Sequence, residues 1–357
     1  MLIAELSIHI IPKSQIGTLF PKLMSNFDNT YPIPLSLELA TSGLLDSPFC
    51  LYDVGAWSGV HRRWRALGQH LAGVGFDLDP DEMQRLAERD KDLTPNFEYR
   101  FGAVSNYNGN TTFDVREHAR DNSLVTGAGN CKVIGQREVP VVTLDTFVLG
   151  EGRATPDFIK LDTEGSELDI LDGAKELLAA GTLVGGEFES AFGAPHEARR
   201  PFFELYQVMS EYGFEIFDLQ TGRLPRPQLP HGRLSQDTRG YVCSEPLGQV
   251  CHLDVLLMRN LPATDPKCEL PVSSALKQIM AFEVYGLNDC AAEVLEHYSG
   301  VLESKLDIAR ARDLLVPHLS GSPLTHEAYM KIGELLSQDH LIRPEFNTAL
   351  SNIVVER

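Results

Sequence analysis

The sequence predicts an α/β fold built on a seven-stranded, mostly parallel sheet with one reversed strand, followed by a helical extension. From residue 50 to about residue 188, short apolar runs alternate with helical patterns, as is typical of βαβ units. The last two apolar runs, 214–219 and 252–259, have no helical pattern between them. Parallel neighbours need a crossover, whereas antiparallel neighbours can be joined by a loop alone. The seventh strand is therefore expected to run against the others.

Seven segments are expected to form the strands, with helices between most of them. The strands are expected at 50–54, 73–77, 97–104, 157–162, 182–189, 214–219 and 252–259. Helices are expected at 59–71, 80–90, 165–178 and 201–212, each from its helical spacing, an opening proline or a closing glycine. The Asn108-Gly109 turn and the apolar residues after it predict a hairpin excursion beyond the third strand.

The chain is expected to have three parts. Residues 1–47 form a helical lead-in, residues 48–260 carry the sheet, and residues 261–357 form the helical extension. Helical spacing in the extension is broken at Gly286 and Pro317, which predicts two or three antiparallel helices. The extension carries no recognised motif, so we expect it to form a homodimer contact or to pack on the sheet.

Charge and composition exclude several function classes. The 357 residues include 31 Lys and Arg against 50 Asp and Glu, a net charge of −19 that repels nucleic acids and anionic lipids. No apolar stretch is long enough for a membrane span, and the N-terminal stretch carries Glu5 without a basic start. We therefore expect no nucleic-acid partner, no membrane span and a cytoplasmic location.

Cysteine and histidine spacing offers no metal signature. The six cysteines contain no CxxC pair, and the eleven histidines show no HExxH or HxH spacing. The sequence therefore predicts free thiols and neither a disulfide framework nor a zinc site. His196, after the fifth predicted strand, could act as a base near neutral pH, but a solvated loop histidine is the favoured interpretation.

The turn after the first predicted strand has the pattern of a cofactor site. It reads Asp53-Val54-Gly55-Ala56-Trp57-Ser58-Gly59, an acid followed by GxxxG, whereas a dinucleotide site would read GxGxxG to seat a pyrophosphate. The pattern favours a cofactor with an amino-acid moiety, with Asp53 near its ammonium and Gly55, Ala56 and Gly59 in the binding turn. A glycine-rich turn without a ligand is the alternative.

Further candidates lie at the ends of the second and third predicted strands. Asp77 stands about twenty residues past the first glycine turn, where a carboxylate accepts hydrogen bonds from a ribose diol. Asp79, directly before Pro80, is expected to be a helix N-cap. Ala103 and Val104 fall where small apolar side chains line an adenine, although simple strand core explains them equally well.

Acidic residues gather at the ends of the fourth and fifth predicted strands. Asp162 and Glu164 follow the fourth strand, and Glu187 is expected at the tip of the fifth. All three are candidates for a base that takes a hydroxyl proton or for groups that grip substrate hydroxyls. Glu167 is expected only to decorate a helix N-terminus. Three carboxylates could also hold Mg²⁺, but no ligand spacing singles such a site out, so no metal site is predicted and a divalent metal is not favoured.

Several motifs together resemble the FkbM family of methyltransferases over residues 50–260. They are KLDTEGSELDILDGA, DVGAWSG, GAVS followed by NGNTTF, VTLDTF, and the strand-end acid before a proline. The resemblance implies the class I methyltransferase fold, S-adenosylmethionine as cofactor, and methyl transfer to an oxygen, often a sugar or polyketide hydroxyl. The family usually has Glu-Pro at the tip of the second strand, where this chain has Asp77-Leu78.

The sequence therefore predicts an S-adenosylmethionine-dependent O-methyltransferase that acts on a hydroxyl of a sugar, glycan precursor or similar small metabolite. The net-basic stretch 220–249 is a candidate lid for an anionic acceptor, with a solvated loop as the alternative. A nicotinamide oxidoreductase would need the missing GxGxxG. A non-catalytic scaffold that binds a partner through the helical tail is the other hypothesis, against which the intact acids and glycines of the motifs speak.

Overall fold

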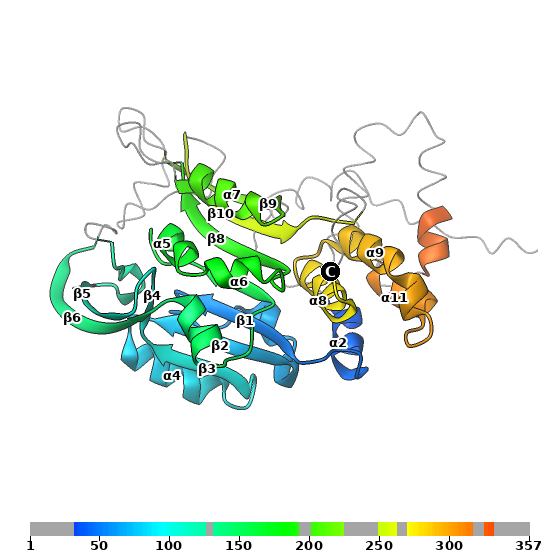
Figure 1. Cartoon of the computed structure of the whole chain (residues 1–357), viewed down its shortest axis with the longest axis horizontal. Coiled ribbons are helices and arrows are strands. Elements are labelled where there is room, and N and C mark those ends of the chain that lie inside the picture. The colour runs from blue at the N-terminus through cyan, green and yellow to red at the C-terminus, as the bar shows by residue number, and fades with distance from the viewer. Residues whose placement is uncertain are drawn as a thin grey trace, which may run out of the picture. The chain divides into compact units, whose positions relative to one another are not determined.

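A computed structural model of the chain (Figure 1) describes residues 32–125, 131–192, 201–224, 249–262, 270–316 and 325–331. By its internal contacts the chain divides into two compact units. The larger unit runs from Thr30 to Ile308, and the smaller one includes Ala309 and the residues after it. Helix α11 (Ile308–Leu315) and a helical segment at 326–331 are the described helices that lie in or enter the smaller unit.

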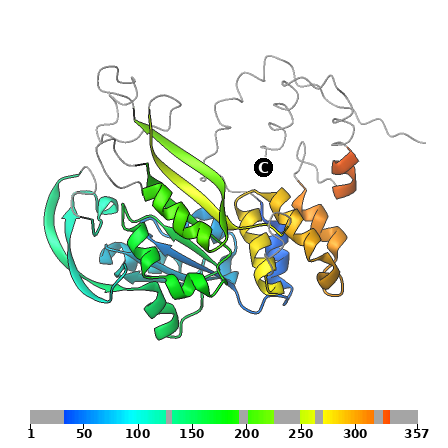
Figure 2. The same cartoon turned by 45° about the horizontal axis from the view of Figure 1, so that its top comes forward.

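The larger unit is built on the predicted seven-stranded sheet. Its strands, in spatial order, are β3 (Asn96–Phe101), β2 (Leu71–Asp77), β1 (Phe49–Val54), β7 (Phe158–Leu161), β8 (Gly185–Ala191), β10 (Gln249–Arg259) and β9 (Phe214–Leu224). All neighbouring pairs are parallel except those of β10, which runs antiparallel to both β8 and β9. This is the class I methyltransferase order, and the prediction of one reversed strand is confirmed. Figure 2 shows β9 and β10 as a long pair at one edge of the sheet.

A second, three-stranded sheet holds the predicted excursion in the order β4 (Ala103–Val104), β6 (Val133–Val142) and β5 (Gly109–Arg116). The expected third strand, 97–104, is therefore wrong in its second half, because the chain leaves the main sheet at Gly102. The predicted hairpin excursion exists as the antiparallel pair β5 and β6, but Asn108-Gly109 is not its turn, because β4 and β5 each pair with β6 and not with each other. Asn108 Oδ1 accepts a hydrogen bond from Thr143 N at 3.0 Å, which ties this turn to the far end of β6.

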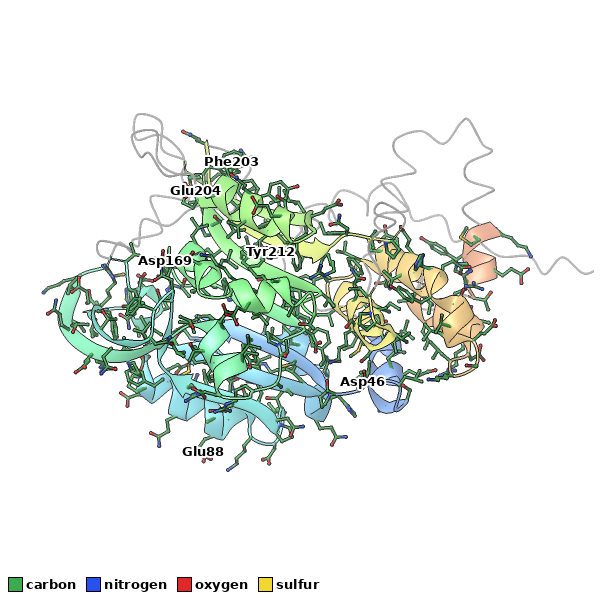
Figure 3. All side chains as sticks on the ribbon, viewed as in Figure 1. Asp46, Glu88, Asp169, Phe203, Glu204 and Tyr212 are labelled. Carbon is green, nitrogen blue, oxygen red and sulfur yellow. The ribbon has the colours of Figure 1, made fainter. Side chains whose placement is uncertain are left out.

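Helices cover both faces of the main sheet. Apolar side chains of α5 (Glu167–Asp172), α6 (Lys175–Ala179) and α7 (Pro201–Glu211) pack against one face, the side on which Figure 3 labels Asp169 and Phe203. On the opposite face, Trp64 of α3 (Arg62–Arg65) lies against Phe49 and Phe158, each with ring centroids 5.0 Å apart. Helix α4 (Pro80–Asp90) packs on β3 and β2.

Two of the predicted helices are shorter than expected. The segment 59–71 contains only α3 and a single 3₁₀ turn at Gly68–His70, where Gly68 has a φ of +56°. The segment 165–178 is broken at Gly173, where an added Cβ would lie 2.3 Å from the Ser105 carbonyl oxygen. This close backbone approach excludes any side chain at position 173 and separates α5 from α6.

Helix α8 (Val272–Val284) is fixed to the sheet by a buried ion pair. Lys277 Nζ lies 2.9 Å from Asp157 Oδ2, and both side chains are less than one-tenth exposed. The same oxygen of Asp157 accepts a hydrogen bond from the Cys50 backbone N–H at 2.7 Å. Gln278 donates to the Arg259 carbonyl oxygen at 3.0 Å. The first helix after the sheet is thus part of the larger unit.

The end of α8 also caps the helix that precedes the sheet, α2 (Pro34–Thr41). The buried Glu283 carboxylate accepts hydrogen bonds from Leu35 N at 3.1 Å and Ser36 N at 2.6 Å, which satisfies two N–H groups that a helix start leaves open. Helices α9 (Asn288–His297) and α10 (Ser299–Leu302) follow α8. The three-part division at residues 47 and 260 stays a prediction. Within the described residues, no helix has the length and apolarity that a membrane crossing requires.

The Lys277–Asp157 pair yields a stability prediction. Replacing Lys277 with Met keeps the side-chain volume but leaves the buried Asp157 carboxylate without its counter-ion, a loss that typically costs about 3 to 5 kcal/mol. We expect the midpoint of urea denaturation to fall accordingly. The control is Lys91→Met, since Lys91 pairs with Glu88 on the exposed surface of the same unit and should leave the midpoint unchanged. Equal midpoints for both variants would contradict the docking role of this pair.

Candidate active site

The turn after β1 is packed directly on the end of β7. Gly55 has a φ of +90°, and an added Cβ would lie 1.7 Å from the Asp162 carbonyl oxygen, so only glycine fits there. The N–H groups of Gly55 and Ala56 both donate to the Phe76 carbonyl oxygen at 2.9 Å. The turn is thus held between the carboxyl ends of β2 and β7, where open α/β sheets bind ligands.

Gly59 is required by packing within the protein. Its φ is +79°, and an added Cβ would lie within 3.0 Å of Leu86, Arg89 and Tyr99 side-chain atoms. The structure therefore gives a reason for glycine at this position that differs from the expected close approach to a ligand. A cofactor contact of the Gly59 or Ala56 backbone stays a prediction.

Asp53 is a buried carboxylate beneath this turn. Its side chain is 4% exposed, and its Oδ1 lies 3.7 Å from Lys160 Nζ. Burial raises the pKa of Asp53 to about 6, although the charge of Lys160 opposes this shift. Within the described residues Oδ1 has no hydrogen-bond partner. An acceptor oxygen of this kind fits the ammonium group that the sequence predicts here.

Asp77 and Asp79 have separate roles at the tip of β2. Asp79 accepts hydrogen bonds from Asp81 N at 3.1 Å and Glu82 N at 3.2 Å, so the predicted N-cap of α4 is confirmed. Asp77 Oδ1 accepts from Asp79 N at 2.9 Å, and burial raises the pKa of Asp77 to about 7. Asp77 thus lies at the strand tip where a ribose contact is predicted.

Ala103 and Val104 are both core residues. Val104 lies in the main hydrophobic cluster of the sheet, and Ala103 lies in the smaller cluster around Phe113 and Val139. Their side chains are 5% exposed or less. An adenine contact of these two residues stays a prediction.

Lys160 connects the cofactor turn to the acidic cluster. Its Nζ lies 2.8 Å from Asp162 Oδ2 and 3.7 Å from Asp53 Oδ1. Burial alone would lower the pKa of Lys160, but the carboxylates of Asp162 and Asp53 outweigh it and raise that pKa. Burial is the largest single influence on Asp162 and raises its pKa, but Lys160, Glu189 and His252 together lower that pKa further, so Asp162 stays ionised. The side chain of Asp162 is 42% exposed and can reach a ligand.

Glu164 has an unusual backbone conformation. Its φ of +58° is the only positive value among the described residues other than glycine, and such strain is typical of functional sites. Ser123 Oγ donates to the carbonyl oxygens of Thr163 and Glu164 at 3.1 and 3.2 Å. Burial, followed by the charge of Asp162, raises the pKa of Glu164 to about 7. The site therefore holds an ionised carboxyl, Asp162, and a partly protonated one, Glu164, two residues apart in the sequence.

Glu167 does more than decorate a helix start, so that expectation is wrong. Its side chain is buried, and its Oε1 accepts hydrogen bonds from Thr163 N at 2.8 Å, Thr163 Oγ1 at 2.8 Å and Gly165 N at 3.3 Å. These bonds fold the loop back over the N-terminus of α5. Because Thr163 and Gly165 flank Glu164, the bonds to Glu167 stabilise the strained backbone conformation of Glu164.

Glu187 does not lie at the tip of its strand, as the sequence analysis expected, because β8 continues to Ala191. In the sheet register Glu187 stands beside Lys160, two residues below the edge. Its Oε2 accepts a hydrogen bond from the Tyr285 hydroxyl at 2.5 Å and lies 3.4 Å from Arg63 Nη1. The carboxylate is thus held under α8, and its role as a base stays a prediction.

Glu189 lies two residues nearer the carboxyl end of β8 and was not among the predicted site residues. Burial, followed by the charge of Asp162, raises the pKa of Glu189 well above its ordinary value. The signal was present in the sequence, since Glu187 and Glu189 alternate along one strand and face the same side of the sheet. Only the position of the strand end was misjudged.

A family match agrees with this arrangement. Residues 54–216, from the end of β1 into β9, match the family model described as the methyltransferase FkbM domain. The chain carries an FkbM methyltransferase domain. It is accordingly an S-adenosylmethionine-dependent methyltransferase, as the resemblance implied. No curated protein matches the sequence.

Solved structures similar to the FkbM domain include other methyltransferases. FkbM methyltransferase from Methylobacillus flagellatus KT is 15% identical, with a TM-score of 0.34, over 68% of this chain and 58% of its own. Magnesium protoporphyrin IX methyltransferase from Synechocystis PCC 6803, with bound S-adenosylmethionine, is 9% identical, with a TM-score of 0.30, over 63% and 76%. A TehB-like methyltransferase from Corynebacterium glutamicum is 13% identical, with a TM-score of 0.26, over 63% and 88%.

The residues of the FkbM domain fit S-adenosylmethionine chemically. The cofactor carries an ammonium group and a ribose diol, both hydrogen-bond donors, and the turn places the acceptor carboxyls of Asp53 and Asp77 at neighbouring strand ends. Its sulfonium supplies an electrophilic methyl group. In the described part of the chain, His, Cys, Asp and Glu side chains form no group of three or more with metal-ligand geometry.

The raised pKa of Asp77 predicts that the free energy of unfolding falls as pH rises and this carboxyl ionises. Folding raises this pKa from 3.8 to about 7, so the stability that Asp77 contributes is complete below about pH 4 and is lost as pH rises to about 7. Asp77→Asn removes this titration and should be more stable than wild type by about 1 to 3 kcal/mol at pH 8, less than the full shift implies because Asp77 is partly exposed.

Urea denaturation of wild type and Asp77→Asn at pH 4 and pH 8 measures this effect. The difference in unfolding free energy between the two proteins at each pH removes the contribution of all other titrating groups. A constant difference between the two pH values would show that Asp77 is not the group that titrates.

Proposed function

We propose that the protein is an O-methyltransferase that transfers the methyl group of S-adenosylmethionine to a hydroxyl of a sugar, glycan precursor or similar small metabolite. The observation that supports this proposal is the contact between the two halves of the site. Gly55 of the cofactor turn lies against the backbone of Asp162, so the cofactor and the carboxyls after β7 share one edge of the sheet.

The chemistry of methyl transfer fits the groups at this edge. An in-line displacement at a methyl carbon mainly requires alignment of the acceptor oxygen and removal of its proton. Asp162, kept ionised by Lys160, accepts a hydrogen bond from the attacking hydroxyl and increases its nucleophilicity. Glu164, in its strained loop, accepts a bond from a neighbouring hydroxyl of a polyol and fixes its orientation. Glu187, bound by Tyr285 and Arg63, supports the sheet beneath them.

The cofactor is held by residues of the turn and of the neighbouring strand ends. In this proposal Asp53 binds its ammonium, Asp77 its ribose, the backbone of Gly55, Ala56 and Gly59 its amino-acid chain, and the segment of Ala103 and Val104 its adenine. Sequence pattern and position at the sheet edge support each assignment.

The carboxyl groups at the sheet edge suit an acceptor that carries several hydroxyl groups. A hydroxyl-rich acceptor matches an edge lined by carboxyls, which accept hydrogen bonds from such groups. The predicted preference for an anionic acceptor depends on the stretch 220–249, of which 225–248 lie outside the described residues. His196 also lies outside them. A cytoplasmic location and a homodimer formed through the helical tail stay predictions.

Cofactor binding gives the first test. We expect calorimetric titration with S-adenosylmethionine and with S-adenosylhomocysteine to give micromolar dissociation constants, and NADH to give no binding heat. Asp77→Ala should weaken both ligands at least about tenfold, or about 1.4 kcal/mol, because the ribose loses its acceptor. Asp81→Ala, an exposed acid on the same helix cap, is the control and should bind as wild type does. Absence of binding by the wild type would favour the non-catalytic scaffold.

Catalysis gives the second test. With ¹³C-methyl-labelled cofactor and a panel of sugars and nucleotide-linked sugars, we expect an O-methyl product identified by its carbon resonance. Glu164→Gln should lower kcat by about tenfold or more with an unchanged dissociation constant for S-adenosylhomocysteine. The exposed Glu176→Gln should have no effect. An N-methyl product in the same assay would contradict the proposed hydroxyl acceptor and indicate an amine in its place.

A further inference from the structure

A row of polar side chains continues from the cofactor turn across the sheet to β10. Asp162 follows β7, Glu189 lies on β8, and His252 and Asp254 lie on β10. In the antiparallel register Asp254 stands opposite Glu189, and His252 stands opposite Ala191. Since side chains two residues apart along a strand share a face, Glu189, His252 and Asp254 lie on one face. The charge of Asp162 acts on Glu189, so the end of β7 belongs to the same row.

His252 faces a carboxyl group from each side of this row. Its Nδ1 lies 3.5 Å from Glu189 Oε1, and its Nε2 lies 3.9 Å from Asp254 Oδ1. On the β9 side the register places Gly222 opposite, which brings no charge. The imidazole is one-third exposed, so it can meet both a ligand and solvent at the sheet edge.

The protonation states of the row favour a neutral imidazole with a defined tautomer. Burial and the charge of Asp162 raise the pKa of Glu189 well above its ordinary value, so Glu189 keeps its proton beside the ionised Asp162. Its Oε1 is then an acceptor for an Nδ1–H of His252, which leaves the lone pair on Nε2. Burial lowers the pKa of His252, and the charge of Asp162 opposes this only in part, so the ring is neutral at pH 7.

We propose that His252 is the general base of the methyl transfer and that Glu189 is its positioning residue. This inference rests on the proposed O-methyltransferase function. The acceptor oxygen forms a bond to the methyl carbon as the carbon–sulfur bond breaks, and the electron pair of that bond stays on sulfur as a neutral thioether. The hydroxyl proton passes to Nε2 of His252 and then to water.

Asp162 is a weaker candidate for this role. Lys160, whose Nζ lies 2.8 Å from Asp162 Oδ2, lowers the proton affinity of that carboxylate. Imidazole has the intrinsic pKa that suits a base near neutral pH. Once protonated, the ring lies beside the negative charges of Asp162 and Asp254, which stabilise it until it releases the proton. The base thus takes the proton at the β10 end of the row.

The test compares His252→Gln with the exposed His297→Gln, a histidine of α9 away from the sheet edge. We expect His252→Gln to lower kcat for a hydroxyl acceptor by about a hundredfold or more while the dissociation constant for S-adenosylhomocysteine and the melting temperature stay at wild-type values. His297→Gln should keep full activity. Added imidazole should restore part of the activity of His252→Ala, which a merely structural role would not allow.

The pH profile of kcat at saturating cofactor supplies a second readout. Wild-type kcat should fall at acidic pH as His252 takes up a proton, and the midpoint of this fall should lie below the ordinary histidine pKa because burial lowers the pKa of His252. His252→Gln should lose this acid limb, and Glu189→Gln, which keeps an acceptor oxygen, should retain it. More than a third of wild-type kcat in His252→Gln, or failure of imidazole to rescue, overturns the base assignment.

A third measurement does not depend on the acceptor. ¹⁵N NMR of histidine-labelled protein at pH 7.5 should show His252 neutral and protonated on Nδ1, and a charged ring or an Nε2–H tautomer would overturn the assignment. If the wild type methylates no hydroxyl compound, the proposed function falls and the base role falls with it. If the wild type methylates a hydroxyl and His252→Gln does so equally well, only the present inference falls.

Discussion

The site depends on the buried ammonium of Lys160. It stands between two carboxylates that belong to different tasks, Asp53 under the cofactor turn and Asp162 at the acceptor edge. A buried charge is stable only when paired, so the lysine, once placed on the central strand β7, fixes both acids around it. It helps to keep Asp162 ionised, and burial, followed by that charge, raises the pKa values of Glu164 and Glu189.

The backbone imposes a second constraint, namely close contacts between segments that only glycine allows. Gly55 and Gly173 each lie where a Cβ would meet the backbone of a neighbouring segment, at Asp162 and Ser105 respectively. These contacts draw the cofactor turn, the acidic loop and the excursion together. Ser123 of the excursion then holds the carbonyl groups of the strained loop, with Glu167 beneath it. Strain at Glu164 is maintained because several segments impose it at once, which is the condition under which such conformations persist.

Much of the fold could be predicted from local pattern. The mostly parallel sheet followed from where helices occur between apolar runs, and the reversed strand followed from the one missing helix. The excursion could not be predicted in detail, because the connection from the end of β5 at Arg116 to the start of β6 at Val133 carries no local signal for their pairing. The broken helix at Gly173 reflects contact with Ser105, and periodicity within one segment contains no information on such a contact.

The candidate site was predictable to the same degree. The acids at positions 53, 77, 162 and 164 stand next to turns, where sequence marks the ends of strands. Glu189 was missed because an error of two residues in a strand end preserves the side-chain alternation, so Glu187 fitted the pattern equally well. His252 was missed because its partners come from another strand, and the register of β10 on β8 brings them together only in the folded chain.

This row explains why a strongly acidic edge suits a reaction that produces a proton. An ionised carboxylate alone binds a hydroxyl well, but several ionised carboxylates together repel one another and would share protons unpredictably. Here Lys160 fixes the charge of Asp162 at one end of the row, Glu189 stays neutral in the middle, and an imidazole stands at the β10 end. The neutral imidazole is thus the group of the row that can take a proton released at the acceptor oxygen.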